Sequence, residues 1–395
     1  MHIALIADTF PPLRNSGAVQ LRDLSIEFVR QGHSVTMLVP APDLTTPWAI
    51  EDYHGVEVVR LRTPPHRHGG NIRRVLGEFA APWWMLRNFR ASPAFTRGIE
   101  GIVWYSPTIF LGPIVRALKR RHRAPTYLIL RDIFPEWMAD MGLMRRGLAY
   151  RLLKGVANFQ YSLADTIGVQ TPGNLTYFED RIRKGRKVEV LQNWLSDATD
   201  HGCPIQIAAT PLAGRKIFVY AGNMGVAQGM GKLIDLAERL NHDSRIGFVL
   251  VGRGSDAELL RADSKKRQLT NTLFFDEIDP DHIPGLYAQC DVGLVALDAR
   301  HRTHNIPGKF ISYMHAGLPV LASINPGNDM ATLVAEEKVG QVSTDTVGTD
   351  LEGLLLTMLD NELAGSETPR RCRALARRLF SSEAAVRQIV QALAG

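Results

Sequence analysis

The sequence predicts an α/β protein of two domains, each a parallel sheet with helices between its strands. The main observation is a repeated unit, an apolar strand followed by a glycine-bearing loop and a helix, which opens one half of the chain at His2 and the other at Lys216. At 395 residues the chain also exceeds the size of one ordinary hydrophobic core. Between the halves, residues 196–214 lack periodic apolar positions, which is typical of a linker.

Composition and charge limit the function classes. Hydrophobic residues make up 45% and charged residues 22%, as in soluble globular proteins. The net charge of +6 suits an anionic substrate or an anionic membrane surface, but it is too small to indicate nucleic acid, and no nucleic-acid motif is present. Three isolated cysteines indicate neither zinc nor a disulfide framework. Without a signal-peptide pattern or an apolar stretch of about 20 residues, a cytoplasmic location is expected.

The first half begins with a βαβ unit. His2–Ala7 is a continuous apolar run, as expected of a strand buried on both faces of a parallel sheet. Ala18–Gln31 has apolar residues at helical spacing, and Gly32 ends it before the next strand, Ser34–Val39. The further strands expected are Val56–Leu61, Gly101–Tyr105, Thr126–Leu130, Thr166–Gln170 and Val188–Leu191, and the further helices are Ile109–Arg121 and Ala149–Ala164.

Gly17 ends the loop that follows the first strand. Ligands of parallel α/β sheets bind outside the carboxyl ends of the strands, so a phosphate or a sugar could approach the backbone closely at Gly17. A plain turn is the alternative interpretation. The dinucleotide pattern GxGxxG is absent, which argues against a dinucleotide oxidoreductase.

Residues 63–97 combine basic and aromatic side chains. Such a mixture on short helices suits the plane of a membrane interface. The alternative is an ordinary helix that packs on the sheet through its aromatic residues and leaves its basic face in water. The basic residues are His66, Arg67, His68, Arg73, Arg74, Arg87, Arg90 and Arg97, and the apolar ones include Phe79, Trp83, Trp84 and Phe89.

Three charged residues, Arg131, Asp132 and Glu136, stand at the end of an apolar strand. Charged groups there are a poor choice for a core and a good one for polar contact with a substrate. We therefore predict that they take part in substrate contact or catalysis. The alternative is that Asp132 and Glu136 only pair with Arg131 or cap the next helix.

The second half repeats the pattern. After the strand Lys216–Tyr220 comes a turn with three glycines, Gly222, Gly225 and Gly229, whose backbone N–H groups can surround an oxyanion. A glycine pair also flanks Arg253, after the next strand. The further elements expected are the strands Ile246–Val251, Leu273–Phe275 and Asp291–Ala296 and the helices Asp281–Ala288 and Glu383–Leu393.

The stretch 303–323 predicts a loop, a helix and a strand. Ile306–Gly308 is a turn signal, Lys309–His315 can form about two helical turns, and Gly317 ends them. A helix that starts after a Gly-Lys turn presents free N–H groups beside an ammonium group, which together make an anion site. The alternative is one more loop between a strand and a helix, with its lysine in water.

Several motifs along the chain form a family pattern: GHSV, RDIFPE at a strand end, YAGNMG with a later QG, FVLVGRGSD, LYAQCDVGLV and PGKFISYMHAGLPV. With them the chain resembles the retaining glycosyltransferases of the GT-B fold, family 4. Within that family it looks most similar to the bacterial transferases of O-antigen and capsule assembly, of the N-acetylfucosamine-transferase type.

The resemblance implies two Rossmann-like, doubly wound domains that face a cleft. Residues 1–195 would bind the acceptor, 196–214 would link the domains, 215–375 would bind the nucleotide-sugar, and 376–395 would form a helix that returns to the N-terminal domain. The implied reaction moves a sugar from a UDP-sugar, such as UDP-N-acetyl-L-fucosamine, to a lipid-linked oligosaccharide with retention of configuration. No metal or other cofactor is expected. The implied location is cytoplasmic and peripheral, on the inner face of the plasma membrane.

In this pattern Lys309 and the loop Gly222–Gly229 would hold the diphosphate, and Asp132 and Glu136 would lie near the acceptor hydroxyl or the donor sugar. Three departures from the family remove charge or change it. Asn223 and Gln228 stand where many members have Arg and Lys, His304 and Ser312 stand where they have paired glutamates, and Arg131-Asp132 stands where His-Asp is frequent.

Charge compensation of the diphosphate would then depend on Lys309. Its expected helpers are Arg253, Arg300 or Arg302. Two rival functions stay open. One is a UDP-sugar 2-epimerase of the same fold, which needs no acceptor, and the other is a non-catalytic nucleotide-sugar-binding protein, which the missing glutamates would allow.

Overall fold

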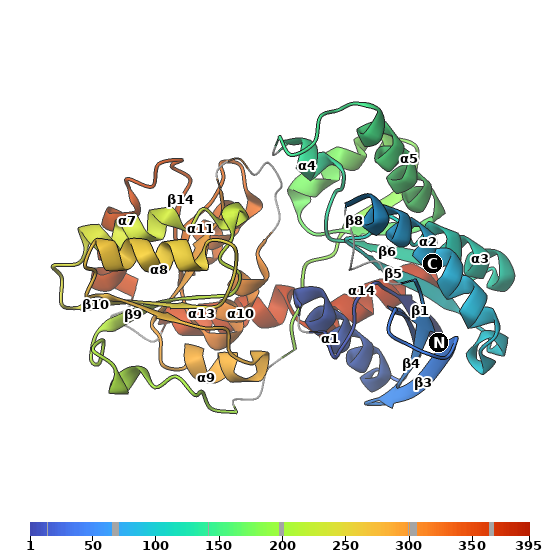
Figure 1. The fold of residues 1–395 in the computed structure, drawn as a ribbon, viewed down its shortest axis with the longest axis horizontal. Helices are drawn as coiled ribbons and strands as arrows, with labels where there is room; N and C mark the ends of the chain where they lie inside the picture. The colour runs from blue at the N-terminus through green and yellow to red at the C-terminus, as the bar shows by residue number, and fades with distance from the viewer. Residues whose placement is uncertain are drawn as a thin grey trace. The chain divides into compact units, whose positions relative to one another are not determined.

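The computed structural model describes residues 1–13, 15–64, 71–140, 142–196, 201–298, 300, 306–362 and 367–395, with only the backbone for 71–76 and 361–362. The chain forms two compact units, the first of Met1–Trp194 with Ser382–Gly395 and the second of Leu195–Ser381. Strands and helices alternate along the chain in both units (Figure 1).

The first unit contains one sheet of eight strands in the order β3-β4-β2-β1-β5-β6-β7-β8. Neighbouring strands are parallel except β3 and β4, which form an antiparallel hairpin. The strand order reverses between β1 and β5, which is where doubly wound sheets bind ligands. The strands are β1 (His2–Ile6), β2 (Ser34–Ala41), β3 (Trp48–Tyr53), β4 (Val56–Arg62), β5 (Gly101–Ser106), β6 (Thr126–Leu130), β7 (Thr166–Val169) and β8 (Lys187–Val190).

The helices of the first unit pack on this sheet. They are α1 (Ser16–Arg30), α2 (Asn71–Arg90), α3 (Gly112–His122), α4 (Glu136–Asp140), α5 (Leu148–Leu163), α6 (Glu179–Arg183) and α14 (Ser382–Ala394), with two 3-10 helices, η1 (Pro93–Thr96) and η2 (Pro172–Phe178). In β1, Ile3 and Leu5 enter a core shared with α1 and α14, whereas Ala4 and Ile6 enter a core shared with α2, α3 and α5. Because side chains alternate along a strand, helices on both faces require an unbroken apolar run.

Two helices of this unit differ from the sequence prediction. α1 begins at Ser16 rather than Ala18, because Asn15 caps it by accepting a hydrogen bond from Ala18 N at 2.8 Å. In place of the short helices expected in residues 63–97, α2 is one helix of 20 residues with Pro82 inside it.

The second unit contains one fully parallel sheet in the order β11-β10-β9-β12-β13-β14. Its strands are β9 (Lys216–Ala221), β10 (Ile246–Val251), β11 (Thr272–Phe275), β12 (Val292–Ala296), β13 (Val320–Ser323) and β14 (Gly340–Ser343). Its helices are α7 (Gly231–Arg239), α8 (Ala257–Lys266), α9 (Ile283–Tyr287), α10 (Gly308–Ala316), α11 (Asp329–Glu337), α12 (Leu351–Thr357) and α13 (Glu367–Leu379). It also has three short 3-10 helices, η3 (Ile207–Ala209), η4 (Val226–Gln228) and η5 (Pro280–His282), and a π-helix, η6 (Met358–Glu362).

The second sheet is also covered on both faces. Ile217 and Val219 of β9 enter a core shared with α9, α10 and α13, and Phe218 and Tyr220 enter a core shared with α7, α8 and α12. The strand order reverses between β9 and β12. The carboxyl ends of these central strands therefore place their loops where a doubly wound sheet binds its ligand.

Residues 201–214, which the sequence suggested as part of a linker, pack within the second unit. Ile205, Ile207 and Leu212 are buried there. Gln289 holds the segment from both sides, because its Nε2 donates to Ile205 O at 2.9 Å and its Oε1 accepts from Ile207 N at 2.9 Å. At the other end of the chain, α14 lies in the first unit, where Gln388 Nε2 donates to Val190 O at 2.9 Å.

Candidate functional site

Two glycine loops meet at the carboxyl edge of the second sheet. They follow β9 and β10, and backbone hydrogen bonds join them. Met224 N donates to Arg253 O at 2.8 Å, and Asp256 N donates to Met224 O at 2.9 Å. Gly222 N donates to Val251 O at 2.9 Å. The two loops therefore form one braced surface rather than two independent turns.

The glycines of the second loop are required by this contact. A Cβ on Gly252 would lie 2.0 Å from Gly222 O, and a Cβ on Gly254 would lie 2.2 Å from Met224 O. Both glycines have positive φ angles, +143° and +154°, which residues with a Cβ rarely adopt. Part of the glycine pattern in the sequence thus reflects how closely the loops approach each other.

Lys309 lies beside the first loop, in the first turn of α10. Its Cε is 3.6 Å, and its Nζ 4.0 Å, from the position that a Cβ on Gly222 would occupy. The ammonium also lies 4.5 Å from the centroid of the Tyr220 ring. Among the described residues, no carboxylate pairs with it, and burial lowers its pKa to about 8. The structure therefore brings together the lysine and the glycine turn that the sequence singled out.

Buried contacts hold α10 in position behind its first turn. Tyr313 Oη lies 3.1 Å from Val219 O and 3.2 Å from Leu294 O. Its ring covers Gly293, where a Cβ would lie 2.4 Å from the ring atoms. Pro307 precedes the helix and provides no side-chain cap. The first N–H groups of α10 lack intrahelical acceptors, so they can bind an anion.

Asn223 and Gln228 bind each other across the first loop. Asn223 Nδ2 donates to Gln228 Oε1 at 3.1 Å, and Gly225 N donates to the same oxygen at 3.1 Å. We call this pair the amide clasp. It closes the loop without adding charge, and it leaves the Asn223 side chain exposed.

The cations expected to help Lys309 have carboxylate partners. Arg253 Nε lies 2.9 Å from Glu277 Oε2, and its side chain is 78% exposed. Arg300 Nη2 lies 2.9 Å from Asp298 Oδ2. Both arginines would have to leave these partners to reach a phosphate.

Three other expected positions add little to the described site. Ser312 Oγ donates back to Gly308 O within α10 at 3.3 Å. Arg302 and His304 lie outside the described residues.

A residue that the sequence did not indicate is Lys232 of α7, whose Nζ lies 3.3 Å from Ser323 Oγ and 3.4 Å from Asp345 O. No motif marks it, because its place at this edge depends on how α7 packs.

In the first unit, the contacts of Arg131 stabilise the fold. It is buried, and its Nη1 donates to Leu191 O at 2.8 Å while its Nη2 donates to Gln192 O at 3.4 Å. Its guanidinium carbon lies 4.6 Å from the centroid of the Trp194 ring. Burial lowers the pKa of Arg131 to about 10. The Arg131 side chain therefore connects the end of β6 to the segment after β8, and both of its terminal nitrogens donate to main-chain carbonyls of the protein.

The two carboxylates that follow Arg131 differ in their surroundings. Glu136 is buried at the start of α4 and pairs with Lys154 of α5, and its Oε2 has no hydrogen-bond partner among the described residues. Asp132 is partly exposed, and burial raises the pKa of its carboxyl while the charge of Arg131 opposes that shift. Asp132 is therefore the better placed of the two to contact a ligand.

Gly17 lies in the first turn of α1 and packs closely. A Cβ there would lie 3.1 Å from Thr9 Cγ2 and 3.4 Å from Tyr105 Cε1. This close approach of α1 to β5 favours glycine whether or not a ligand binds.

A hollow of about 570 Å³ lies at the carboxyl ends of β1, β2, β5 and β6. Its lining is mostly apolar, with three polar side chains, Asp8, Glu78 and Thr108. The apolar lining is Pro40, Ala81, Pro82, Met85, Pro107, Ile109, Phe110, Leu111 and Phe134. A mostly apolar hollow with a few polar groups is typical of a small-molecule site.

The described part of the chain contains neither a metal-binding cluster nor a membrane-spanning helix. No group of three or more His, Cys, Asp or Glu side chains is arranged to hold a metal ion. In the same residues, every helix is too short or too polar to cross a bilayer.

Both halves of the chain match models of known protein families. Residues 17–194 match the family model described as Glycosyl transferase 4-like domain, and residues 215–358 match the one described as Glycosyl transferases group 1. One similar protein is WcaI of Escherichia coli strain K12, named a putative colanic acid biosynthesis glycosyl transferase, with 25% identity over 79% of this chain and 78% of WcaI. Another is WbjE of Pseudomonas aeruginosa, named a probable glycosyltransferase, with 24% identity. The matched region spans about half of both chains, 54% of each.

Solved structures share the fold over almost the whole chain. A sucrose-phosphate synthase from Thermosynechococcus elongatus has a TM-score of 0.73 at 17% identity, covering 99% of this chain and 97% of its own. A trehalose-phosphate synthase from Burkholderia xenovorans has a TM-score of 0.74 at 13% identity, and HepE from Anabaena, solved with UDP, has 0.67 at 16%, each covering 100% of both chains. The fold is therefore GT-B, and the chain belongs to the glycosyltransferases, with a 4-like first domain and a group 1 second domain.

Proposed function

We propose that this glycosyltransferase moves a sugar from a UDP-sugar to a lipid-linked saccharide in the assembly of a bacterial surface polysaccharide. The observation that carries the proposal is the Lys309 ammonium, which has no carboxylate partner among the described residues and adjoins both the Gly222 loop and the start of α10. Two relatives support it: WcaI is named for colanic acid biosynthesis, and HepE was solved with UDP.

The chemistry of the second unit suits a leaving diphosphate. As the bond between the anomeric carbon and the β-phosphate oxygen breaks, negative charge grows on the leaving phosphate. In this proposal Lys309 and the first N–H groups of α10 face that charge, and such preorganised groups stabilise a transition state without reorganisation. The N–H groups of Gly222, Met224 and Gly225 contribute no hydrogen bond to it, because they donate to oxygen atoms of the protein. A metal ion is then not needed, because Lys309 and the start of α10 do its electrostatic work.

Transfer with retention follows if the acceptor attacks from the face that the phosphate leaves. The acceptor oxygen then forms the new bond to the anomeric carbon, and its proton passes to the leaving phosphate oxygen. No protein nucleophile is required. In the first unit, Asp132 would orient the acceptor, while Arg131 and the pair Glu136–Lys154 would position the chain around it.

The hollow beside β1 and β5 is our candidate for the acceptor sugar. Asp8, Glu78 and Thr108 offer oxygen atoms to sugar hydroxyls, and the apolar lining suits a sugar's C–H faces. Its two carboxylates would disfavour an anionic group, so the acceptor's phosphates would lie outside it. The narrower proposal, from resemblance, is that the donor sugar is N-acetyl-L-fucosamine. The enzyme would act as a peripheral protein on the cytoplasmic face of the membrane.

The test is transfer itself. Purified protein is incubated with a panel of UDP-, GDP- and dTDP-sugars and a lipid-linked saccharide fraction, and both nucleotide release and glycosylated product are measured. We expect a UDP-sugar to be consumed only with acceptor, and Lys309→Met to reduce turnover by about 100-fold, as loss of an oxyanion-stabilising group does. Lys265→Met, which removes an exposed lysine of α8, is the matched control.

Other results would select a rival function. A new UDP-sugar formed without acceptor would indicate an epimerase. Binding of UDP without hydrolysis or transfer, across the whole panel, would indicate a binding protein. Full turnover by Lys309→Met would refute the assignment of this lysine.

A further inference from the structure

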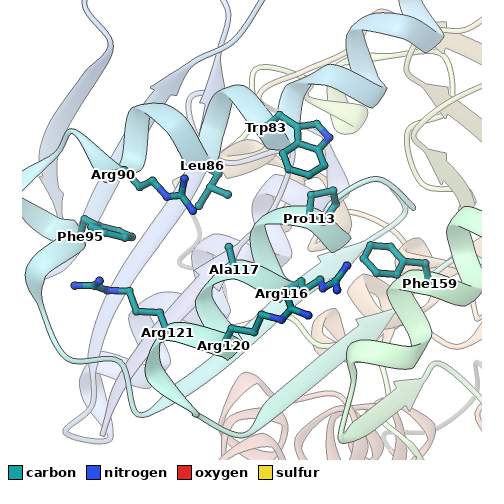
Figure 2. A pocket seen from close by; sticks show the side chains of 10 residues that line it. All are labelled: Trp83, Leu86, Arg90, Phe95, Pro113, Arg116, Ala117, Arg120, Arg121 and Phe159. Atoms are coloured by element: carbon teal, nitrogen blue, oxygen red, sulfur yellow. The ribbon is translucent and has the colours of Figure 1, made fainter.

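A basic groove lies between α2 and α3 in the first unit. Its volume is about 740 Å³. In Figure 2, Arg90 and Trp83 project from α2 on one side, Arg116, Arg120 and Arg121 project from α3 on the other, and Phe159 closes one end. The remaining lining residues are Leu86, Phe95, Pro113 and Ala117.

Among the described residues, the four arginines of the groove have no anionic partner. None of these residues places a carboxylate in the lining, and none of the four arginines makes an ion pair or a hydrogen bond with them. Arg121 lies 4.2 Å from the centroid of the Phe95 ring, and Arg116 lies 5.9 Å from that of Phe159. Nearby Arg97, in contrast, pairs with Glu57 at 2.8 Å. Like charges this dense repel one another unless an anion lies between them.

Large apolar side chains are also exposed on two of the helices that line the groove. On α2, Trp83 is 58% exposed and Phe79 is 51% exposed. On α5, Leu148 is 84% exposed and Leu152 is 69% exposed. Positions 148, 152 and 159 share one face of the helix, so the stripe that starts at Leu148 ends at Phe159, in the groove. Exposed apolar groups clustered in this way mark an interaction surface.

The two faces of α2 line two different spaces. Glu78, Pro82 and Met85 line the acceptor hollow, whereas Trp83, Leu86 and Arg90 line the basic groove. A surface that bound phosphates through the groove would therefore hold the acceptor hollow one helix away from those phosphates.

We propose that this surface docks the enzyme on an anionic lipid bilayer. Arg90, Arg116, Arg120 and Arg121 bind headgroup phosphates, while Trp83 and the leucines of α5 enter the interfacial layer. Charge complementarity selects the occupant, because unpaired guanidinium groups beside exposed tryptophan and leucine fit lipid phosphates over acyl chains. The inference depends on the proposed function in one respect: docking on the bilayer would bring the enzyme to a lipid-linked acceptor. Binding to the bilayer needs neither donor nor acceptor.

The test is co-sedimentation of the full chain with vesicles of phosphatidylcholine, with and without phosphatidylglycerol. We expect binding only to the anionic vesicles, weakened by added salt. Arg120→Glu/Arg121→Glu should weaken it by at least about 25-fold, since one basic residue contributes about five-fold. The control Lys265→Glu/Lys266→Glu makes the same change of charge on α8 of the other unit and should bind as the wild type does. Trp83→Ala should weaken binding without changing its salt dependence.

Equal binding to neutral and anionic vesicles, or equal loss in the two double variants, would overturn the proposal. So would tight binding of inorganic phosphate or of an acidic protein without any binding to vesicles. A failure of the proposed transfer reaction can be told apart from a failure of bilayer binding. On a water-soluble acceptor lacking its lipid, Arg120→Glu/Arg121→Glu should keep wild-type turnover, whereas Lys309→Met should lose turnover and still bind vesicles.

Discussion

Affinity for UDP should fall as the pH rises through 8, and Lys309→Met should abolish that dependence. Burial lowers the pKa of this ammonium to about 8 in the free protein. A diphosphate beside it favours the charged form and raises the pKa again. Binding therefore takes up a proton wherever the free lysine is neutral, so UDP binds more weakly at high pH.

The size of the effect follows from linkage. If only the ammonium form binds, the dissociation constant grows as one plus the ratio of neutral to charged lysine, which is about ten-fold between pH 7 and pH 9. At pH 8, binding should take up about half a proton. The terminal phosphate of UDP ionises near pH 6, so its own titration contributes little in this range.

Isothermal titration calorimetry in buffers of different ionisation enthalpy measures the dissociation constant of UDP and the number of protons taken up on binding in the same experiments. Lys265→Met should behave as the wild type does, because this lysine is exposed and lies on α8. Constant affinity of the wild type across the range would show that Lys309 does not contact the diphosphate. The same pH slope in Lys309→Met would show that another group titrates.

Three further results are expected. In thermal melts without ligand, Lys309→Met should raise stability by up to about 3 kcal/mol at pH 7, because a lysine with a lowered pKa destabilises the fold while charged, and the gain should vanish as pH rises from 8 to above 10.5. Gly252→Ala should destabilise the protein and abolish UDP binding, since its Cβ would meet Gly222 O, whereas Gly231→Ala, with open space around it, should do neither. Glu136→Gln should cost about 1–3 kcal/mol in urea melts, because the glutamine oxygen can still accept a hydrogen bond from Lys154 but no longer neutralises the charge of its half-buried ammonium.

The sequence predicted most strands of both sheets because their signal is local. Runs such as Ile3–Ile6 are apolar at every position, which only a strand covered on both faces requires. The edge strand β3 was missed because its residues are half-exposed and include Glu51 and Asp52. Its one local signal is the turn at His54 and Gly55, both with positive φ, which joins it to β4.

Part of the candidate site could be predicted from the family resemblance, which implied that Lys309 and the Gly222 loop act on the same diphosphate. The structure gives the physical reason, because the carboxyl ends of β9 and β12 share one edge of the parallel sheet and the loops after them lie close together. The partners of Arg131 could not be predicted, because the carbonyls of Leu191 and Gln192 reach it only when β8 has joined the sheet. The pair Glu136–Lys154 likewise depends on how α4 packs against α5.

The amide clasp changes how a donor diphosphate would be neutralised. Gln228 Oε1 is already used twice, by Asn223 Nδ2 and Gly225 N, so the loop offers a ligand hydrogen bonds but no charge. The nearby arginines are held by Glu277 and Asp298. The ammonium of Lys309 and the partial positive charge at the start of α10 then have to balance the diphosphate together. A pKa near 8 suits this arrangement, because burial makes the charged form of Lys309 unfavourable as long as no anion lies beside it. A diphosphate next to the ammonium removes that penalty, and the removed penalty adds to the binding free energy of the diphosphate.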